Sequence, residues 1–166
     1  SVMPGSYQRI QLRSEGESAD IVEKFYWDLP YPDQGYEHNP TEKQAVDEFR
    51  EVFSEAVRIR LRADVPVVSY LSGGVDSTAV ASTATKIRGE SIPTFTIQIA
   101  DPKFDETDRA LAAAKTIGST PTIVTLHGPD ISAAYPELVR ASDCAVVDTS
   151  CAALLCLAKE VHRQNY

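Results

Sequence analysis

The sequence predicts an α/β domain with a doubly wound parallel sheet that is truncated, and three observations support this prediction. First, three apolar runs have the length of β-strands and begin at or just after a proline: 67–71, 94–99 and 122–126. Second, helix-length segments separate these runs, and parallel strands need such crossover connections. Third, the chain stops at Tyr166, directly after a predicted helix, where the alternation requires another strand.

Two segments have the pattern of amphipathic helices. The first extends from about residue 41 towards Pro66 and contains neither Gly nor Pro. Apolar residues recur in it at three- and four-residue steps, as on one face of a helix: Val46, Phe49, Val52, Phe53 and Ala56. The second is predicted at about 150–163, where apolar side chains again share one face.

Glycine and proline mark the limits of the other predicted helices. Two helices are each followed by a glycine suited to a left-handed cap: 75–88 by Gly89 and 105–117 by Gly118. A short helical stretch after Asp130 is expected to break at Pro136, because proline has no N–H group for a helix interior.

The first 40 residues differ in character from the rest. Proline and glycine interrupt polar stretches there, and aromatic residues lie between them: Tyr26, Trp27, Tyr31 and Tyr36. This pattern predicts an extended connector, partly packed through its aromatic side chains. We therefore divide the chain into a connector, 1–40, and a folded domain, 41–166.

Composition excludes several classes of protein. With 43% hydrophobic and 24% charged residues, the 166-residue chain resembles an ordinary soluble domain. No apolar run approaches the ~20 residues of a membrane helix, and a net charge of −8 does not favour nucleic acid. The three cysteines form no CxxC pair and are expected to be small, buried thiols. No secretion signal is evident, so we expect a cytoplasmic protein.

The most informative motif follows the first predicted strand. There the chain reads Ser72-Gly73-Gly74-Val75-Asp76-Ser77 and continues into a helix. Two glycines let the backbone turn sharply and approach a ligand, while the first N–H groups of the helix point outward. Phosphate suits such a loop, and Ser72 and Ser77 add hydroxyl donors. Asp76 would repel the phosphate unless a divalent cation lay between them, which predicts Mg²⁺.

Other phosphate loops do not fit this motif. The chain has no GxxxxGK[ST] sequence, and the hexapeptide lacks the third glycine of GxGxxG. A purely structural alternative is a Gly-Gly turn between strand and helix, with Asp76 as a capping residue.

The hexapeptide after an apolar strand resembles the PP-loop of the N-type ATP pyrophosphatases, whose fold is of the adenine-nucleotide α-hydrolase type. The surrounding segment 63–77 is similar to that of the glutamine-dependent asparagine synthetases, and weaker likeness extends over nearly all of the chain. The resemblance implies that 1–40 is a connector from a missing glutaminase domain. It also implies that 41–166 is part of an ATP-pyrophosphatase synthetase domain.

The reaction implied by the resemblance uses ATP to adenylate the side-chain carboxylate of aspartate. Pyrophosphate leaves, and ammonia derived from glutamine attacks to give asparagine and AMP. By analogy, Asp76 would position Mg²⁺, and backbone groups at Tyr70 and Ile97 would contact the adenine. The full set of expected cofactor-binding residues is Tyr70, Leu71, Ser72, Gly73, Gly74, Val75, Asp76, Ser77 and Ile97.

The resemblance also places some functional parts elsewhere. Catalytic residues are expected beyond Tyr166 and the glutaminase cysteine before Ser1, so this fragment alone is expected to be inactive. The full-length protein is expected to form a homodimer. Two alternatives stay open: a β-lactam-forming or other PP-loop amide ligase, and a catalytically incomplete fragment.

Other acidic residues are expected to cap helices. Asp105, Glu106 and Asp108 lie where a helix begins, so the helix dipole explains them without a metal. Asp143 and Asp148 precede the last helix, and capping is again the favoured interpretation over a place in the site.

Overall fold

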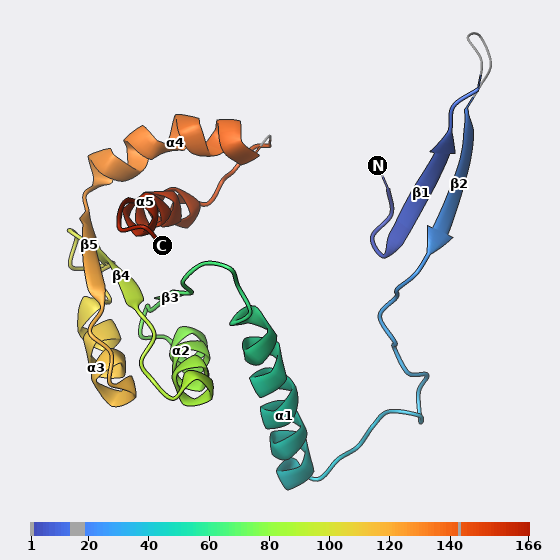
Figure 1. The fold of residues 1–166 in the computed structure, drawn as a ribbon, viewed down its shortest axis with the longest axis horizontal. Helices are drawn as coiled ribbons and strands as arrows, with labels where there is room; N and C mark the ends of the chain where they lie inside the picture. Colours follow the sequence, from blue (N-terminus) through green and yellow to red (C-terminus); the bar gives the residue numbers. More distant parts are fainter. Residues whose placement is uncertain (1, 14–18, 143) are drawn as a thin grey trace. The chain divides into compact units, whose positions relative to one another are not determined.

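A computed structural model describes residues 2–13, 19–142 and 144–166. It divides into two compact units, Ser1–Lys43 and Gln44–Tyr166, close to the break expected near residue 40 (Figure 1). The assignment of the first unit to a connector from another domain stays a prediction. Asp143 lies outside the described residues.

The first unit contains an antiparallel pair of strands, β1 (Ser6–Gln11) and β2 (Asp20–Phe25). The Ser6 hydroxyl donates to Glu23 Oε1 over 2.8 Å, and this bond lowers the pKa of Glu23. The sequence predicted only an extended connector, so the hairpin was missed. The four aromatic residues expected to pack the connector are more than half exposed: Tyr26, Trp27, Tyr31 and Tyr36.

The second unit is built on a parallel sheet of three strands, β3 (Ser69–Tyr70), β4 (Thr94–Ile99) and β5 (Thr122–Leu126). The strands lie in the order β3-β4-β5. The bounds predicted for β4 and β5 are confirmed, whereas β3 is shorter than the predicted 67–71. The described strands show no reversal of order, so the doubly wound arrangement stays a prediction while the α/β class is confirmed.

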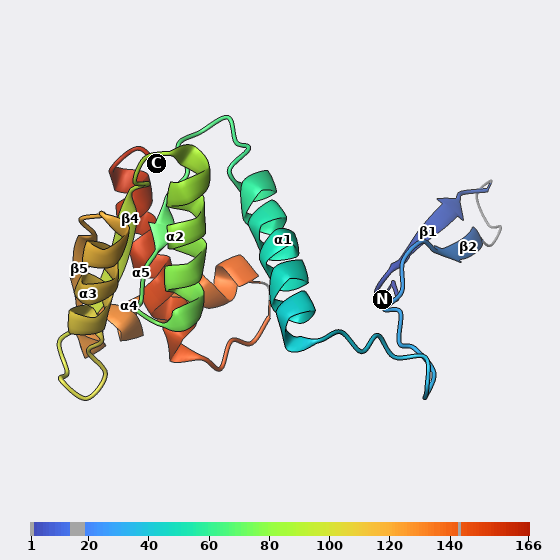
Figure 2. The same cartoon turned by 90° about the horizontal axis from the view of Figure 1, so that it is seen from below.

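Helices cover both faces of this sheet (Figure 2). On one face, α2 (Val75–Arg88) and α3 (Thr107–Ile117) bury Ala81 and Ala114 against Leu71. On the other face, α5 (Thr149–Arg163) buries two side chains against Phe95 of β4, namely Leu157 and Val161. The alanines bring α2 and α3 close to the sheet, and this close approach shapes the turn between β3 and α2.

Both predicted glycine caps are present, because Gly89 and Gly118 have φ angles of 75° and 69°. Helix α3 begins at Thr107 and not at Asp105. The difference arises because Asp105 Oδ1 accepts a hydrogen bond from the N–H of Thr107 at 3.0 Å, which places Asp105 before the first helical turn. Asp105 thus accepts from the first N–H group of α3, while Glu106 occupies the N-cap position and its side chain makes no cap hydrogen bond.

Helix α4 (Gly128–Ser142) runs through Pro136 without a break, contrary to the prediction. Contacts with α5 and the segment before it hold both sides of the proline in place. The Tyr135 hydroxyl donates to the carbonyl oxygen of Val146 at 3.1 Å, and Lys159 Nζ lies 2.5 Å from Glu137 Oε2. Tertiary contacts thus outweigh the hydrogen bond that proline cannot make.

Helix α1 (Glu42–Arg60) confirms the predicted amphipathic segment, but only its C-terminal part is packed. Val57 is buried with Ala84 and Ile92. The earlier apolar residues of the stripe are about half exposed or more: Val46, Phe49 and Val52. None of the described helices is both long and apolar enough to cross a membrane.

The three cysteines have free thiols, but the expectation that they are buried is wrong. Cys144 is exposed, and Cys151 and Cys156 are half-buried. Cys144 lies in the segment between α4 and α5, and the other two lie on α5 outside its fully buried set of residues.

Capping by Asp148 at the start of α5 leads to a test. The Asp148 carboxylate accepts a hydrogen bond from Ser150 N–H at 2.8 Å, and this bond lowers the pKa of Asp148 below its ordinary value of 3.8. A depressed pKa contributes stability that is present above the ordinary pKa and is lost as the pH falls through the folded-state pKa. Asp148→Ala should therefore lower Tm by about 2–4 °C at neutral pH.

Thermal melts of the Asp148 variants between about pH 7 and pH 2 would measure this effect. The difference between wild type and Asp148→Ala should shrink at the acid end. Asp148→Asn is the matched control, because its amide oxygen can still accept the bond but does not titrate. A difference that stayed constant with pH would show that the charge of Asp148 does not support the helix.

Candidate functional site

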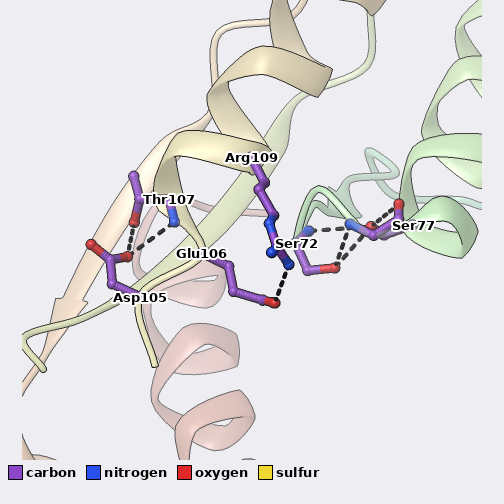
Figure 3. A network of polar contacts seen from close by, with 7 residues as sticks. Ser72, Ser77, Asp105, Glu106, Thr107 and Arg109 are labelled. Atoms are coloured by element: carbon purple, nitrogen blue, oxygen red, sulfur yellow. Dashed lines mark hydrogen bonds and ion pairs between the residues drawn. The ribbon is translucent and has the colours of Figure 1, made fainter. Parts of the chain in front are cut away.

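The segment between β3 and α2 forms a tight turn that two serine hydroxyls hold closed (Figure 3). The Oγ atoms of Ser72 and Ser77 lie 3.0 Å apart, and the N–H of Ser72 donates to Ser77 Oγ at 3.2 Å. The N–H of Gly74 donates to Ser72 Oγ at 3.3 Å. The hydroxyls expected to contact phosphate are therefore also used to fix the shape of the loop.

Gly73 lets the start of α3 approach the turn. Its φ is +77°, and a Cβ atom on it would lie 2.4 Å from the carbonyl carbon of Arg109 and 2.5 Å from the nitrogen of Ala110. The sequence attributed both glycines to the approach of a ligand. Of the two, only Gly74 leaves room for a ligand. It is exposed, and a Cβ atom on it would have only Ser72 Oγ within 4 Å, at 3.4 Å.

Four backbone N–H groups in the turn and the first helical turn can bind an anion. Among the described contacts, the backbone N–H groups of Gly73, Val75, Asp76 and Ser77 have no acceptor in the chain. They lie at the N-terminus of α2, a 14-residue helix whose dipole adds partial positive charge there. This arrangement favours a phosphate or a carboxylate.

A cavity of about 620 Å³ opens beside this loop, at the carboxyl ends of the strands. Its wall is mainly apolar and comes from β3 and the loop after it, the first turn of α2, β4, the segment before α3, α4 and α5. The residues that line it include Tyr70, Ser72, Ile97, Phe104, Glu106 and Leu154. Among the described residues that line it, Glu106 carries the single carboxyl group, and none is Lys, Arg or His.

The short β3 leaves part of the β4 edge free next to the cavity. β3 pairs with β4 only at Ser69 and Tyr70, and the N–H of Leu71 then donates to Phe95 O at 2.8 Å. Because backbone groups alternate between the two sides of a parallel strand, the N–H and C=O of Ile97 point to the same side as the C=O of Phe95. In the described chain no strand follows there, so both groups of Ile97 can bind a ligand.

Charged residues gather where α3 begins beside the loop (Figure 3). The Arg109 guanidinium lies 3.3 Å from Glu106 Oε1, and both side chains are more than half exposed. Two hydrogen bonds from Thr107 hold the pKa of Asp105 below its ordinary value. Asp105 is thus occupied as a cap, whereas Glu106 faces the cavity.

Asp76 is the residue expected to hold Mg²⁺. Its side chain is exposed in the first turn of α2 and makes no described hydrogen bond or ion pair. The described residues contain no group of three or more His, Cys, Asp or Glu side chains that could hold a metal on their own. One free carboxylate beside an anion-binding loop fits Mg²⁺, which commonly takes one or two protein carboxylates together with phosphate oxygens and waters.

Comparison with known proteins assigns the family. The family model described as asparagine synthase matches residues 48–166, which include the whole loop and the cavity. The chain belongs to the asparagine synthase family. This membership confirms the resemblance found in the sequence around the loop.

Two curated relatives show how much of a longer protein the chain matches. The amidase chyE of Penicillium rubens is 35% identical over 99% of this chain, but the match covers 26% of its own length. A putative glutamine-hydrolysing asparagine synthetase of Mycobacterium tuberculosis is 34% identical over 75% of this chain and is covered over 19% of its length. The chain thus spans about a quarter or less of the length of these relatives.

A solved structure of NMN synthetase from Francisella tularensis matches 65% of this chain and is itself covered over 42%, with 18% identity. Its TM-score of 0.35 is too low to support an inference.

The structure brings five of the nine predicted site residues to the wall of the cavity: Tyr70, Leu71, Ser72, Ser77 and Ile97. The other four lie in the loop and first helical turn outside this wall: Gly73, Gly74, Val75 and Asp76. The predicted set therefore forms two adjoining parts, an apolar cavity and a turn with free N–H groups.

The sequence missed the wall contributed by α5. Thr149, Ser150, Ala153, Leu154 and Leu157 line the cavity. The apolar stripe at 150–163 signalled that this helix packs on the sheet, but no periodicity could show that its N-terminal half covers the carboxyl ends of the strands. Glu106 was also missed, because its place at a helix start explained it as a cap.

Proposed function

We propose that this chain is the ATP-binding part of an amide-forming ligase. The observation that carries the proposal is the turn of free N–H groups beside a mainly apolar cavity of about 620 Å³. The turn offers fixed donors for phosphates, and the cavity has the size and character of a small-molecule site. Membership of the asparagine synthase family supports ATP as the ligand.

The two parts of the site suggest an orientation for the nucleotide. Adenine would enter the cavity and contact backbone groups at Tyr70 and Ile97, and the free edge of β4 supports this role for Ile97. The phosphates would then lie on the N–H groups of the loop, with Leu71 and Val75 completing the contact surface. Mg²⁺, held by Asp76 and the phosphates, would neutralise part of the phosphate charge.

The reaction we propose is adenylation of the aspartate side chain followed by attack of ammonia derived from glutamine. The products are asparagine, AMP and pyrophosphate. In this reaction the loop stabilises charge as it develops on the leaving pyrophosphate, because its donors are already oriented. The catalytic residues, homodimerisation and cytoplasmic localisation expected from the resemblance stay predictions. Because a relative that is 35% identical is named an amidase, an acceptor of ammonia other than aspartate remains an alternative.

The test is binding of ATP to the chain by titration calorimetry with and without Mg²⁺. We expect binding in both cases and tighter binding with the metal. Asp76→Asn should weaken binding about tenfold when Mg²⁺ is present and have little effect in EDTA, because a charge-assisted contact is lost only with the metal. Asp108→Asn, in the first turn of α3, is the matched control.

Two results would contradict the proposal in different ways. Equal weakening by Asp76→Asn with and without Mg²⁺ would assign this carboxylate a structural role. A folded wild-type chain that does not bind ATP at millimolar concentration would overturn the proposed function itself.

A further inference from the structure

We infer that Arg109 binds the pyrophosphate part of the nucleotide, and that Glu106 pairs with Arg109 until phosphate replaces it. The inference rests on the proposed function, because it names a further residue for the same ligand. The Arg109 side chain comes from α3 and lies outside the loop motif that identifies the site.

The charge around the cavity is mainly negative. Among the described residues that line the cavity none is cationic, whereas Glu106 contributes a carboxyl group. Asp76 adds a second carboxyl group at the loop. A helix N-terminus supplies the equivalent of only about half a positive charge. A polyphosphate at this loop would therefore meet two carboxylates and little compensating charge unless a cation approached from a neighbouring element.

The Arg109 side chain begins close to the loop. A Cβ atom on Gly73 would lie 2.8 Å from the Cβ of Arg109, so the side chain starts directly on the loop. In Figure 3 it runs from the first turn of α3 towards the Glu106 carboxylate, with Ser72 on its other side in this view. The same close approach that requires glycine at position 73 thus brings a guanidinium to the phosphate-binding turn.

Glu106 is a weak partner for Arg109. The Glu106–Arg109 pair is long, at 3.3 Å, involves a single described contact, and is exposed at both ends. Exposed ion pairs of this kind contribute little to stability. A guanidinium can bind two phosphate oxygens at once with shorter, charge-assisted bonds, so a phosphate should compete successfully with Glu106.

The alternative cation is Lys103, which precedes the cavity-lining Phe104. Its backbone N–H bonds to Asp101, which ties it to the turn before α3, but no described contact brings it to the loop. Lys103→Ala therefore belongs in the test beside Arg109→Ala.

The experiment measures binding of pyrophosphate and of adenosine separately, in EDTA, to the whole chain. Arg109→Ala should weaken pyrophosphate binding about tenfold and leave adenosine binding within about twofold. Arg109→Lys should retain part of the affinity because it keeps the charge. Glu106→Gln should strengthen pyrophosphate binding a few-fold, and this gain should be smaller when Arg109 is already alanine.

The matched control is Arg50→Ala, since Arg50 is also an exposed helical arginine paired with an acid three residues away, Asp47. It should change neither affinity. An Arg109→Ala variant within twofold of wild type for pyrophosphate, an equal loss for adenosine, or a loss confined to Lys103→Ala would each overturn the inference. If the wild-type chain bound neither probe, the proposed function would fail as well, so the two failures are distinguishable.

Discussion

Replacing Gly73 by alanine is expected to lower the free energy of unfolding by about 3–5 kcal/mol. Part of the loss arises because the backbone there has a φ of +77°, which L-residues with a Cβ atom adopt at a cost of about 1–2 kcal/mol. The larger part is steric, since the new Cβ would lie 2.4 Å from the carbonyl carbon of Arg109 and 2.5 Å from the Ala110 nitrogen. Backbone atoms cannot turn away as a flexible side chain can, so α3 must shift.

The matched control is Gly89→Ala. Gly89 has nearly the same φ, +75°, but nothing lies within 4 Å of its absent Cβ. It should therefore lose only about 1 kcal/mol, the cost of the left-handed conformation. Urea unfolding of both variants followed by circular dichroism would measure the difference. Equal losses would mean that α3 does not pack on the loop as described.

Leu157→Ala is expected to lower the free energy of unfolding by about 2–5 kcal/mol. Leu157 is 1% exposed and packs against Phe95, so it joins α5 to the centre of the sheet. Truncation removes buried apolar surface and leaves a void next to the cavity. Because α5 forms part of the cavity wall, binding of ATP should weaken together with stability.

Leu154 on the same helix provides the comparison. It also lines the cavity but is 42% exposed, so Leu154→Ala should cost less than about 1 kcal/mol. Both variants have the same change in helix propensity, and the difference between their urea midpoints therefore reports burial. Similar midpoints would contradict the packing of α5 on β4.

Local signals in the sequence were sufficient to predict most of the helices and strands of the second unit. Helix α2 and strands β4 and β5 have the predicted bounds, because glycine and proline mark their ends and apolar residues fill their interiors. The prediction of a phosphate site at the loop rests on similar local signals, glycines and serines between a strand and a helix, and stays a prediction.

What the sequence could not show depends on contacts between distant residues. Pro136 breaks a helix in isolation, but α4 continues because its neighbours hold it. The role of Gly73 was misjudged for the same reason, since nothing near it in sequence reveals that Arg109 lies against it. The cavity wall from α5 likewise exists only after the helix has packed on the sheet.

The contact between the Ser72 and Ser77 hydroxyls orders the loop when the protein folds, before any ligand binds. Contacts within the chain itself fix this turn, so its entropy is lost as the protein folds and not when a phosphate arrives. A phosphate bound there, as proposed, would meet donors that already have their final orientation. Charge around the loop would then influence the rate of binding more than any rearrangement of the loop.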